Sequence, residues 1–288
     1  MRKHARSKCD FSLRPYSVRA SAKMKLKING TILNVLEAGV ENYNKTRPSL
    51  VFLHYFGGSS GTWTEVIERL AKDYHCVAPD LRGFGASDAL PENFAVKDSA
   101  ADVSDLISTL GIENFVLTGH SMGGKIALAY AAGKPENLQS LILLAPSPPT
   151  PEPMPERERT SLLETRGSRR AAEDTIREIT FQSLSAKVFE RTVNDTLRAS
   201  EAAWKAWLET GSREDVSALI GNIAIPVLVA AGADDALITP KLLEREIVRR
   251  VKNARLVVVA EAKHLLPLEA PEIIADLIRE HCLKPCGF

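Results

Sequence analysis

A serine stands between two glycines at residues 119–123, which read Gly-His-Ser-Met-Gly. This G-x-S-x-G pattern follows the apolar run 115–117 and precedes a second apolar run at 126–129, an order that predicts a strand, a sharp turn and a helix. Glycines suit such a turn because larger side chains would collide there. The turn would lift the hydroxyl of Ser121 above a sheet, beside the free N–H groups of a helix start. The pattern therefore predicts a serine nucleophile.

A serine hydroxyl is a weak nucleophile, so it needs a base, and the base needs an acid to orient it. Of the six histidines, His264 stands just after the apolar run 256–259, at the sheet edge where Ser121 should also emerge. We predict that His264 is the general base. The acid should lie between serine and histidine in the chain, where the run 227–231 leads to Asp234 and Asp235. Asp235 is favoured, and Asp234 is the alternative.

Attack on a carbonyl creates an oxyanion that needs two hydrogen-bond donors already in place. The backbone N–H of Met122, directly after the nucleophile, should supply one donor. The glycine-rich loop 54–59 follows the first buried strand and should supply the other, which we assign to the N–H of Phe56. Tyr55, Trp204 and Trp207 are candidates for the substrate pocket, although aromatic residues three apart on a helix also serve simply to pack it down.

Short apolar runs elsewhere predict the sheet that positions these groups. Six continuous runs fit strands buried on both faces, as in a parallel sheet between helices: 50–53, 75–78, 115–117, 141–144, 227–230 and 256–259. Asn29-Gly30 between apolar flanks predicts a hairpin of two more strands. A helical pattern from Val103 to Leu110 ends before Gly111. The expected fold is α/β, with about eight strands that are antiparallel at the start and parallel afterwards.

One segment interrupts this alternation. Six of the ten residues 146–155 are proline, and the next 55 or so contain no run typical of a strand. Ser168, Ser185 and Ser200 are suitable N-caps for three short helices. We predict that residues 146–212 form a helical lid inserted into a core of residues 24–145 and 213–288. Residues 1–23 are expected to be a disordered basic extension.

Taken together, the motifs resemble the α/β-hydrolase superfamily from about Met24 to the C-terminus, the lid excepted. The motifs that carry the resemblance are the five segments 54–58, 80–87, 119–124, 232–235 and 263–264. The similarity is greatest to the lid-bearing branch of esterases, perhydrolases and C–C hydrolases. It implies a triad of Ser121, Asp235 and His264, an oxyanion hole at Phe56 and Met122, and a structural turn that contains Asp80, Arg82 and Gly85.

Two positions depart from that pattern. Tyr55 stands where many members have glycine, and a tyrosine does not readily adopt a positive φ, so the oxyanion loop is expected to differ in detail. Lys263 replaces the glycine that commonly precedes the histidine, and an inward lysine would disfavour a protonated His264. Neither departure removes a catalytic atom.

The expected activity is hydrolysis of a small carboxylic ester or related acyl compound through an acyl-enzyme. The alternatives are cleavage of a C–C bond or acyl transfer to peroxide by the same triad, and a non-catalytic ligand receptor on the same fold. The sequence offers no site for an organic cofactor or a metal. A serine at the nucleophile position also argues against the haloalkane dehalogenases and epoxide hydrolases of the superfamily, which use aspartate there.

Composition excludes several other classes of protein. The 288 residues carry a formal net charge of +1, which gives no electrostatic drive toward nucleic acid. No apolar run approaches the roughly 18 residues of a membrane span. The first 27 residues hold nine Lys or Arg and one acid, so an organelle transit peptide is an alternative to the expected cytoplasmic location. Whether the chain is a monomer or a homodimer stays open.

Overall fold

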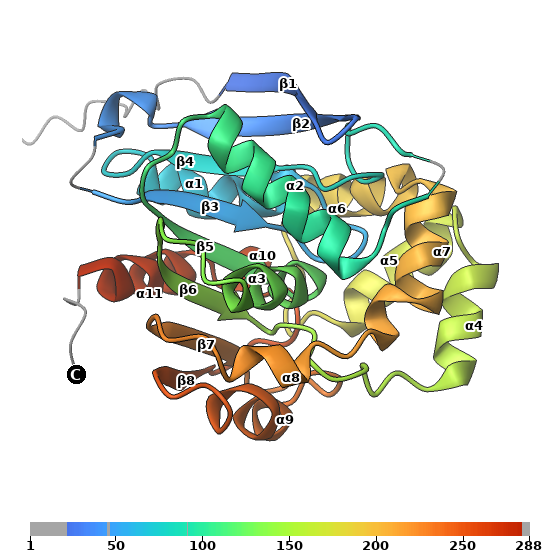
Figure 1. The fold of residues 1–288 in the computed structure, drawn as a ribbon. Helices are drawn as coiled ribbons and strands as arrows, with labels where there is room; N and C mark the ends of the chain where they lie inside the picture. Colours follow the sequence, from blue (N-terminus) through green and yellow to red (C-terminus); the bar gives the residue numbers. More distant parts are fainter. Residues whose placement is uncertain (1–21, 45–46, 91, 284–288) are drawn as a thin grey trace, which may run out of the picture.

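One mixed sheet runs through the computed structural model, which describes residues 22–44, 47–90 and 92–283 (Figure 1). Within these ranges the sheet has eight strands in the spatial order β1-β2-β4-β3-β5-β6-β7-β8. In chain order they are β1 (Ala22–Ile28), β2 (Thr31–Ala38), β3 (Ser49–Leu53), β4 (Cys76–Pro79), β5 (Phe115–His120), β6 (Leu138–Leu144), β7 (Val227–Gly232) and β8 (Ala254–Val259). The pairs β1–β2 and β2–β4 are antiparallel and the others are parallel, which confirms the predicted fold class.

The first two strands form the predicted hairpin. Asn29 and Gly30 both have positive φ, 45° and 81°, as a tight turn between twisted strands requires. β1 begins two residues earlier than expected, because Ala22 and Lys23 pair with Glu37 and Leu36. The predicted boundary at Met24 is therefore wrong by two residues. The rest of the predicted basic extension, residues 1–21, lies outside the described residues.

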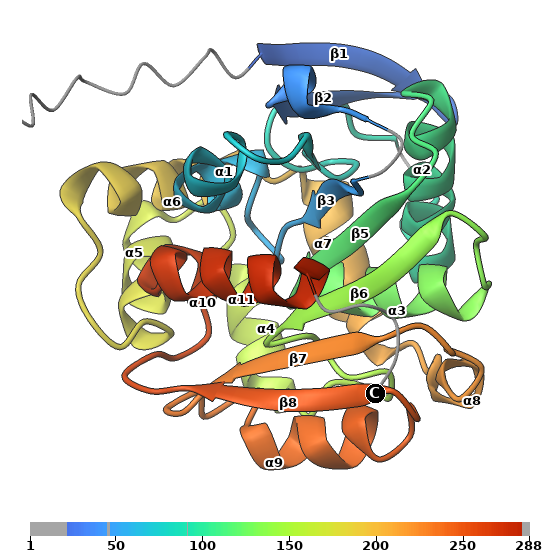
Figure 2. The same ribbon diagram turned by 90° about the vertical axis from the view of Figure 1, so that its left-hand side faces the viewer.

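Helices cover both faces of the sheet (Figure 2). α1 (Thr64–Leu70) and α11 (Pro271–Leu283) lie on one face, and α2 (Val96–Thr109), α3 (Met122–Ala132) and α8 (Ser217–Ile220) lie on the other. Because both faces are covered, all of β3, β5 and β7 is buried, as the continuous apolar runs predicted. The same prediction is wrong for the run 256–259, because β8 is the last strand of the sheet and is only partly covered, with Val258 49% exposed. The short helices α9 (Pro240–Leu243) and α10 (Leu266–Glu269) follow β7 and β8, and a π-helix at Glu244–Val248 extends α9.

Four helices within residues 146–212, here called the inserted segment, separate β6 from β7. They are α4 (Glu156–Glu164), α5 (Arg169–Glu178), α6 (Ala186–Arg198) and α7 (Glu201–Glu209), and they lie beyond the carboxyl ends of the parallel strands (Figure 1). The hydroxyls of Ser168, Ser185 and Ser200 cap α5, α6 and α7 as predicted. The predicted number of three helices is wrong, because α4 starts after Pro155 without a side-chain cap.

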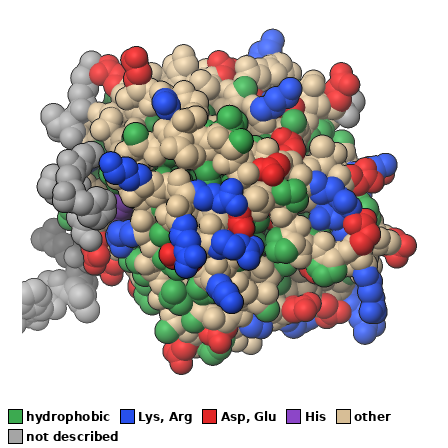
Figure 3. Space-filling model, turned by 60° about the horizontal axis from the view of Figure 1, so that its bottom comes forward, with side chains coloured by type: hydrophobic (Ala, Val, Ile, Leu, Met, Phe, Trp, Pro, Cys, Tyr) green, Lys and Arg blue, Asp and Glu red, His purple; other side chains and the backbone are tan. Residues whose placement is uncertain are grey.

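The surface carries charges of both signs. Seen from below Figure 1, Lys and Arg side chains gather near the middle of the face, with acidic side chains among them (Figure 3). Around the π-helix the arginines have acidic neighbours, since Arg245 and Arg250 both pair with Glu246. Within the described ranges, none of the helices combines the length and apolar character needed to cross a bilayer.

Candidate active site

The turn that carries Ser121 is as tight as the glycine pattern predicted. Ser121 connects β5 to α3 with φ 51° and ψ −115°, a positive φ that is strained for a residue with a side chain. A Cβ added to Gly119 would lie 2.4 Å from the carbonyl oxygen of Gly123, and one added to Gly123 would lie 2.5 Å from that of Leu53. Both positions are therefore closed to larger residues by backbone atoms.

Three side chains from distant parts of the chain form one hydrogen-bonded chain at this turn. His264 Nε2 lies 2.9 Å from Ser121 Oγ, and His264 Nδ1 lies 2.7 Å from Asp235 Oδ2. Asp235 Oδ1 accepts from the N–H groups of Leu237 and Ile238, at 3.0 and 2.9 Å, which fixes the carboxylate. The structure thus brings together the serine, the histidine and the favoured acid. The alternative acid, Asp234, is exposed.

Burial and nearby charges set the protonation states of His264 and Asp235. Burial opposes a charge on His264, but the hydrogen bond that its Nδ1–H donates to Asp235 and the charges of Asp235, Glu152 and Glu269 outweigh it, so the pKa of His264 is raised. Burial alone would raise the pKa of Asp235, yet its hydrogen bond to His264 and the backbone N–H groups lower it. Asp235 is therefore a carboxylate poised to stabilise an imidazolium.

The two expected oxyanion donors are the backbone N–H groups of Met122, directly after Ser121, and of Phe56, in the loop after β3. The N–H of Met122 begins α3, where no intrahelical partner exists. Among the described residues, no group accepts a hydrogen bond from the N–H of Phe56. The loop differs from the glycine pattern as expected, because the positive φ of 84° falls at Gly57 rather than at Tyr55.

Lys263, the second departure, points away from the imidazole. Its Nζ donates to the carbonyl of Glu178 in the inserted segment at 2.7 Å. The side chain therefore contacts the end of α5 and does not place an ammonium beside His264.

The turn after β4 is structural, as the resemblance implied. Asp80 accepts hydrogen bonds from Asn34 Nδ2 and from the N–H groups of Ser60 and Ala86, at 2.9, 2.6 and 2.8 Å. Arg82 makes a two-pronged ion pair with Asp102, with both side chains buried. These contacts hold the turn between β2, which carries Asn34, and α2, which carries Asp102.

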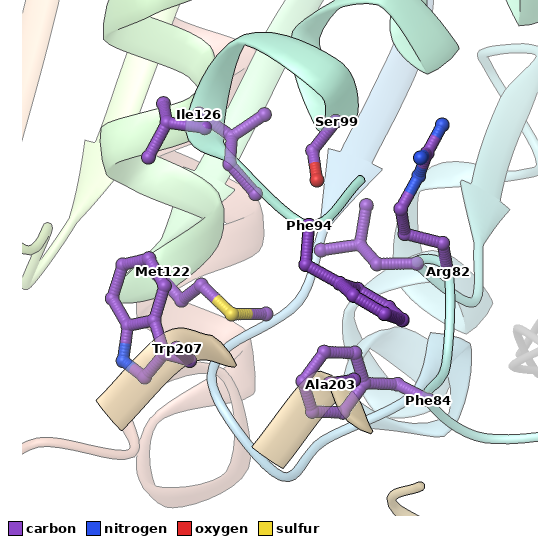
Figure 4. A pocket seen from close by; sticks show the side chains of 10 residues that line it. Arg82, Phe84, Phe94, Ser99, Met122, Ile126, Ala203 and Trp207 are labelled. Carbon is purple, nitrogen blue, oxygen red and sulfur yellow. The ribbon is translucent and has the colours of Figure 1, made fainter. Parts of the chain in front are cut away.

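The turn at residues 119–123 is here called the elbow. A small cavity lies next to it, between the core and the inserted segment (Figure 4). Its lining is mainly apolar and includes Met122, Trp207, Phe84 and Phe94. Of the three predicted pocket residues, only Trp207 lines this cavity. Trp204 instead packs on Phe56, with ring centroids 4.3 Å apart.

Tyr55 is also outside the cavity lining. It is buried against the ring of His120, with centroids 5.2 Å apart. The residue does, however, lie next to Phe56 on the loop expected to bind the oxyanion. Its side chain also belongs to an apolar cluster with Ile176 and Val193 of the inserted segment and with Leu265, so it packs between His120 and that segment.

Sequence reasoning missed two groups that contact the loop of His264. His120 is fully buried, its Nε2 donates to the carbonyl of His264 at 2.8 Å, and burial lowers its pKa to about 3, so it stays neutral. Glu269 contacts the same loop through its carboxylate. Adjacency to Ser121 was the only signal for His120, and no motif marks Glu269. In the described part of the chain, no three His, Cys, Asp or Glu side chains are placed to hold a metal ion.

Comparisons with known proteins agree with this architecture. A family model described as alpha/beta hydrolase fold matches residues 48–271. An esterase from Exiguobacterium antarcticum superposes with a TM-score of 0.83 at 22% identity, over 91% of this chain and 100% of that one. Lipase 3 from a Moraxella species is 25% identical over 95% of this chain and 85% of its own length. An uncharacterized protein of Mycobacterium tuberculosis is 37% identical over 98 residues, which cover 34% of this chain and only 29% of that protein.

The family match and the sheet order define the class of protein, and the tight turn at Ser121 agrees with it. The chain belongs to the α/β-hydrolase family.

Proposed function

We propose that this protein is a serine hydrolase that cleaves a small carboxylic ester or related acyl compound through an acyl-enzyme intermediate. The observation that carries the proposal is the hydrogen-bonded chain from Ser121 through His264 to Asp235. It supplies a nucleophile, a base within reach of the hydroxyl proton and an acid that orients the base.

The mechanism follows from the atoms in contact. Asp235 accepts a hydrogen bond from the protonated Nδ1 of His264. The lone pair of His264 is therefore on Nε2, where it can receive the proton of Ser121 Oγ. As Oγ attacks the carbonyl carbon, the N–H groups of Phe56 and Met122 bind the developing oxyanion. The imidazolium then gives its proton to the leaving alcohol. Water then loses a proton to the same nitrogen and attacks the acyl carbon. The bond from that carbon to Ser121 Oγ breaks, the carboxylic acid leaves, and Nε2 returns the proton to Oγ.

The surroundings favour a small apolar substrate group. Met122 contributes its N–H to the oxyanion hole and its side chain to the apolar cavity, which connects the two features. Trp207 of α7 lines the same cavity from the inserted segment. This shared lining supports a role for the inserted segment as a lid that closes over an acyl or alcohol group.

Turnover of p-nitrophenyl acetate and butyrate by the wild type and by Ser121→Ala tests this function. The wild type is expected to hydrolyse at least one of the two esters, and Ser121→Ala to fall to the background rate because no other group takes over the attack. A fluorophosphonate probe should label the wild type at Ser121 and leave the variant unlabelled. Background turnover and no labelling of the wild type, over a broad acyl panel, would favour a ligand receptor instead.

A further inference from the structure

The backbone of the loop that carries His264 is held from two directions. The N–H of His264 donates to the carbonyl of Ile179 in the inserted segment at 3.1 Å. Its carbonyl accepts from Nε2 of His120, one residue before the nucleophile, at 2.8 Å. The position of the imidazole therefore depends on groups from β5 and from the inserted segment as well as on Asp235.

A single carboxylate completes this frame. Glu269, the last residue of α10, accepts at Oε1 from the N–H of Leu265 at 2.9 Å and at Oε2 from the N–H of Lys263 at 3.3 Å. These two donors flank His264 on both sides. Oε2 also accepts from the N–H of Phe181, just beyond α5, at 2.6 Å. One side chain thus joins both sides of the His264 loop to the inserted segment.

We propose that Glu269 is a positioning residue, which holds His264 against Ser121 and couples the loop of His264 to residues 178–181 of the inserted segment. This inference rests on the proposed function. Two further contacts cross the same junction, from His264 N–H to Ile179 and from Lys263 Nζ to Glu178. A displacement of the end of α5 would therefore also displace His264. Glu269 contacts the residues before and after His264 as well as Phe181 of the inserted segment.

Glu269 acts on His264 through its charge as well as through its hydrogen bonds to the loop. The groups that face the imidazole are Asp235 from the loop after β7, Glu152 from the start of the inserted segment, Glu269 from α10 and His120 from β5. The three carboxylates raise the pKa of His264, whereas His120 stays neutral. Burial raises the pKa of Glu269, against three backbone hydrogen bonds that favour its ionised form.

Two substitutions separate the charge of Glu269 from its reach. Glu269→Gln keeps the length but places an amide against N–H donors and removes the charge. We expect kcat to fall roughly ten- to a hundredfold through misplacement of the base, with KM little changed. The acid limb, which is the rise of kcat/KM with pH as His264 loses its proton, should move to lower pH by roughly half a unit or more. The reason is that loss of a nearby negative charge lowers the pKa of His264. Glu269→Asp keeps the charge but is one methylene too short, so kcat should fall while the acid limb stays near its wild-type position.

Glu272→Gln is the matched control, because this exposed glutamate lies three residues further on and pairs with Arg69. It should leave kcat and the acid limb unchanged. Glu269→Gln with a lowered thermal midpoint but wild-type kcat and an unmoved acid limb would show that Glu269 serves only to stabilise the fold, which overturns the proposal.

Failure of the proposed function would have a different signature. If the wild type turns over no acyl substrate, the imidazole pKa of His264 measured by NMR in the wild type and in Glu269→Gln still reports the coupling. A lower pKa in the variant together with an inactive wild type would contradict the hydrolase assignment and leave Glu269 as a positioning residue for His264. An unchanged imidazole pKa would contradict the coupling itself.

Discussion

The imidazole of His264 must be neutral to accept a proton, and its surroundings work against neutrality. The hydrogen bond and charge of Asp235 and the charges of Glu152 and Glu269 outweigh burial, so its pKa lies above the ordinary 6.5 of histidine. A base with a raised pKa is protonated over a wider acidic range. We therefore expect kcat/KM for a p-nitrophenyl ester to rise with pH through a midpoint above 6.5 and then to level off. A flat profile from about pH 5 to 9 would contradict the role of His264 as base.

The two neighbouring aspartates give a matched pair of variants. Asp235 is buried and bonded to His264, whereas Asp234 is exposed. Asp235→Asn should reduce kcat by roughly four orders of magnitude, because an amide can donate to Nδ1 and favour the wrong tautomer. Asp234→Asn should leave kcat within about twofold, since an exposed side chain off the hydrogen-bonded chain contributes little. Steady-state kinetics and the circular dichroism of both variants provide the measurement, and a reversed order of effects would exchange their roles.

The residues of the site could be predicted to different extents. Ser121 is marked by glycines that a backbone turn requires, and His264 by its place after a strand. Asp235 could only be favoured over Asp234, because both follow the same strand and their burial depends on the fold. Glu269 could not be found, since its partners are backbone N–H groups, which exist at nearly every position of any sequence.

At the scale of elements, the elbow depends on how closely α3 approaches the end of β3. A Cβ on Gly123 would lie 2.5 Å from the carbonyl oxygen of Leu53 and 2.7 Å from that of His54, and backbone atoms cannot turn aside. Gly123→Ala should therefore shift the elbow, lower the free energy of unfolding by roughly 1–3 kcal/mol and reduce kcat by more than that loss of folded protein explains. Urea unfolding and active-site titration measure the two effects separately.

Gly221→Ala is the control for this substitution. The nearest atom to a Cβ there is the carbonyl oxygen of Arg250 at 4.0 Å, so the added methyl has room. Its unfolding free energy should match or slightly exceed that of the wild type, because alanine restricts the unfolded chain. If Gly123→Ala behaved in the same way, close packing of α3 on β3 would not be what holds the serine in place.

The elements themselves were predictable where one face or both had to be apolar. Continuous apolar runs located six strands and Asn29-Gly30 located the hairpin. The helix α4 was missed, because it starts after Pro155 without a capping side chain and therefore lacks the signal that marked its three neighbours. The spatial order of the strands, with β4 between β2 and β3, depends on long-range pairing that no local pattern encodes.

At the scale of the whole molecule, one buried lysine connects the inserted segment to the core. Lys125 of α3 is fully buried, and its Nζ donates to the carbonyls of Thr150 and Ser212, at 3.2 and 3.3 Å. These two carbonyls lie near the start and the end of the inserted segment. The sequence predicted the insertion from its prolines and polar helices, but a lysine one turn after Ser121 carries no sign that it contacts both ends of the insertion.

This lysine makes the stability of the molecule depend on pH in an unusual direction. Burial lowers the pKa of Lys125 to about 8, against the charges of Glu152, Glu214 and Asp215. Below pH 8 the amine is charged in both states. From there to about 10.5 the unfolded chain holds a proton that the folded protein releases, so the contribution of Lys125 to stability rises with pH, by up to about 3 kcal/mol over the window.

Urea unfolding of the wild type and Lys125→Met from about pH 7 to 10 tests this dependence, because subtraction removes the titration of groups common to both. The free energy of unfolding of the wild type minus that of the variant should increase with pH by roughly 1–3 kcal/mol. The same subtraction with Lys205→Met, an exposed lysine 3.8 Å from Glu209, should give a nearly constant difference. A constant difference for Lys125→Met as well would mean that the ammonium is as well solvated at the junction of core and inserted segment as it is in water.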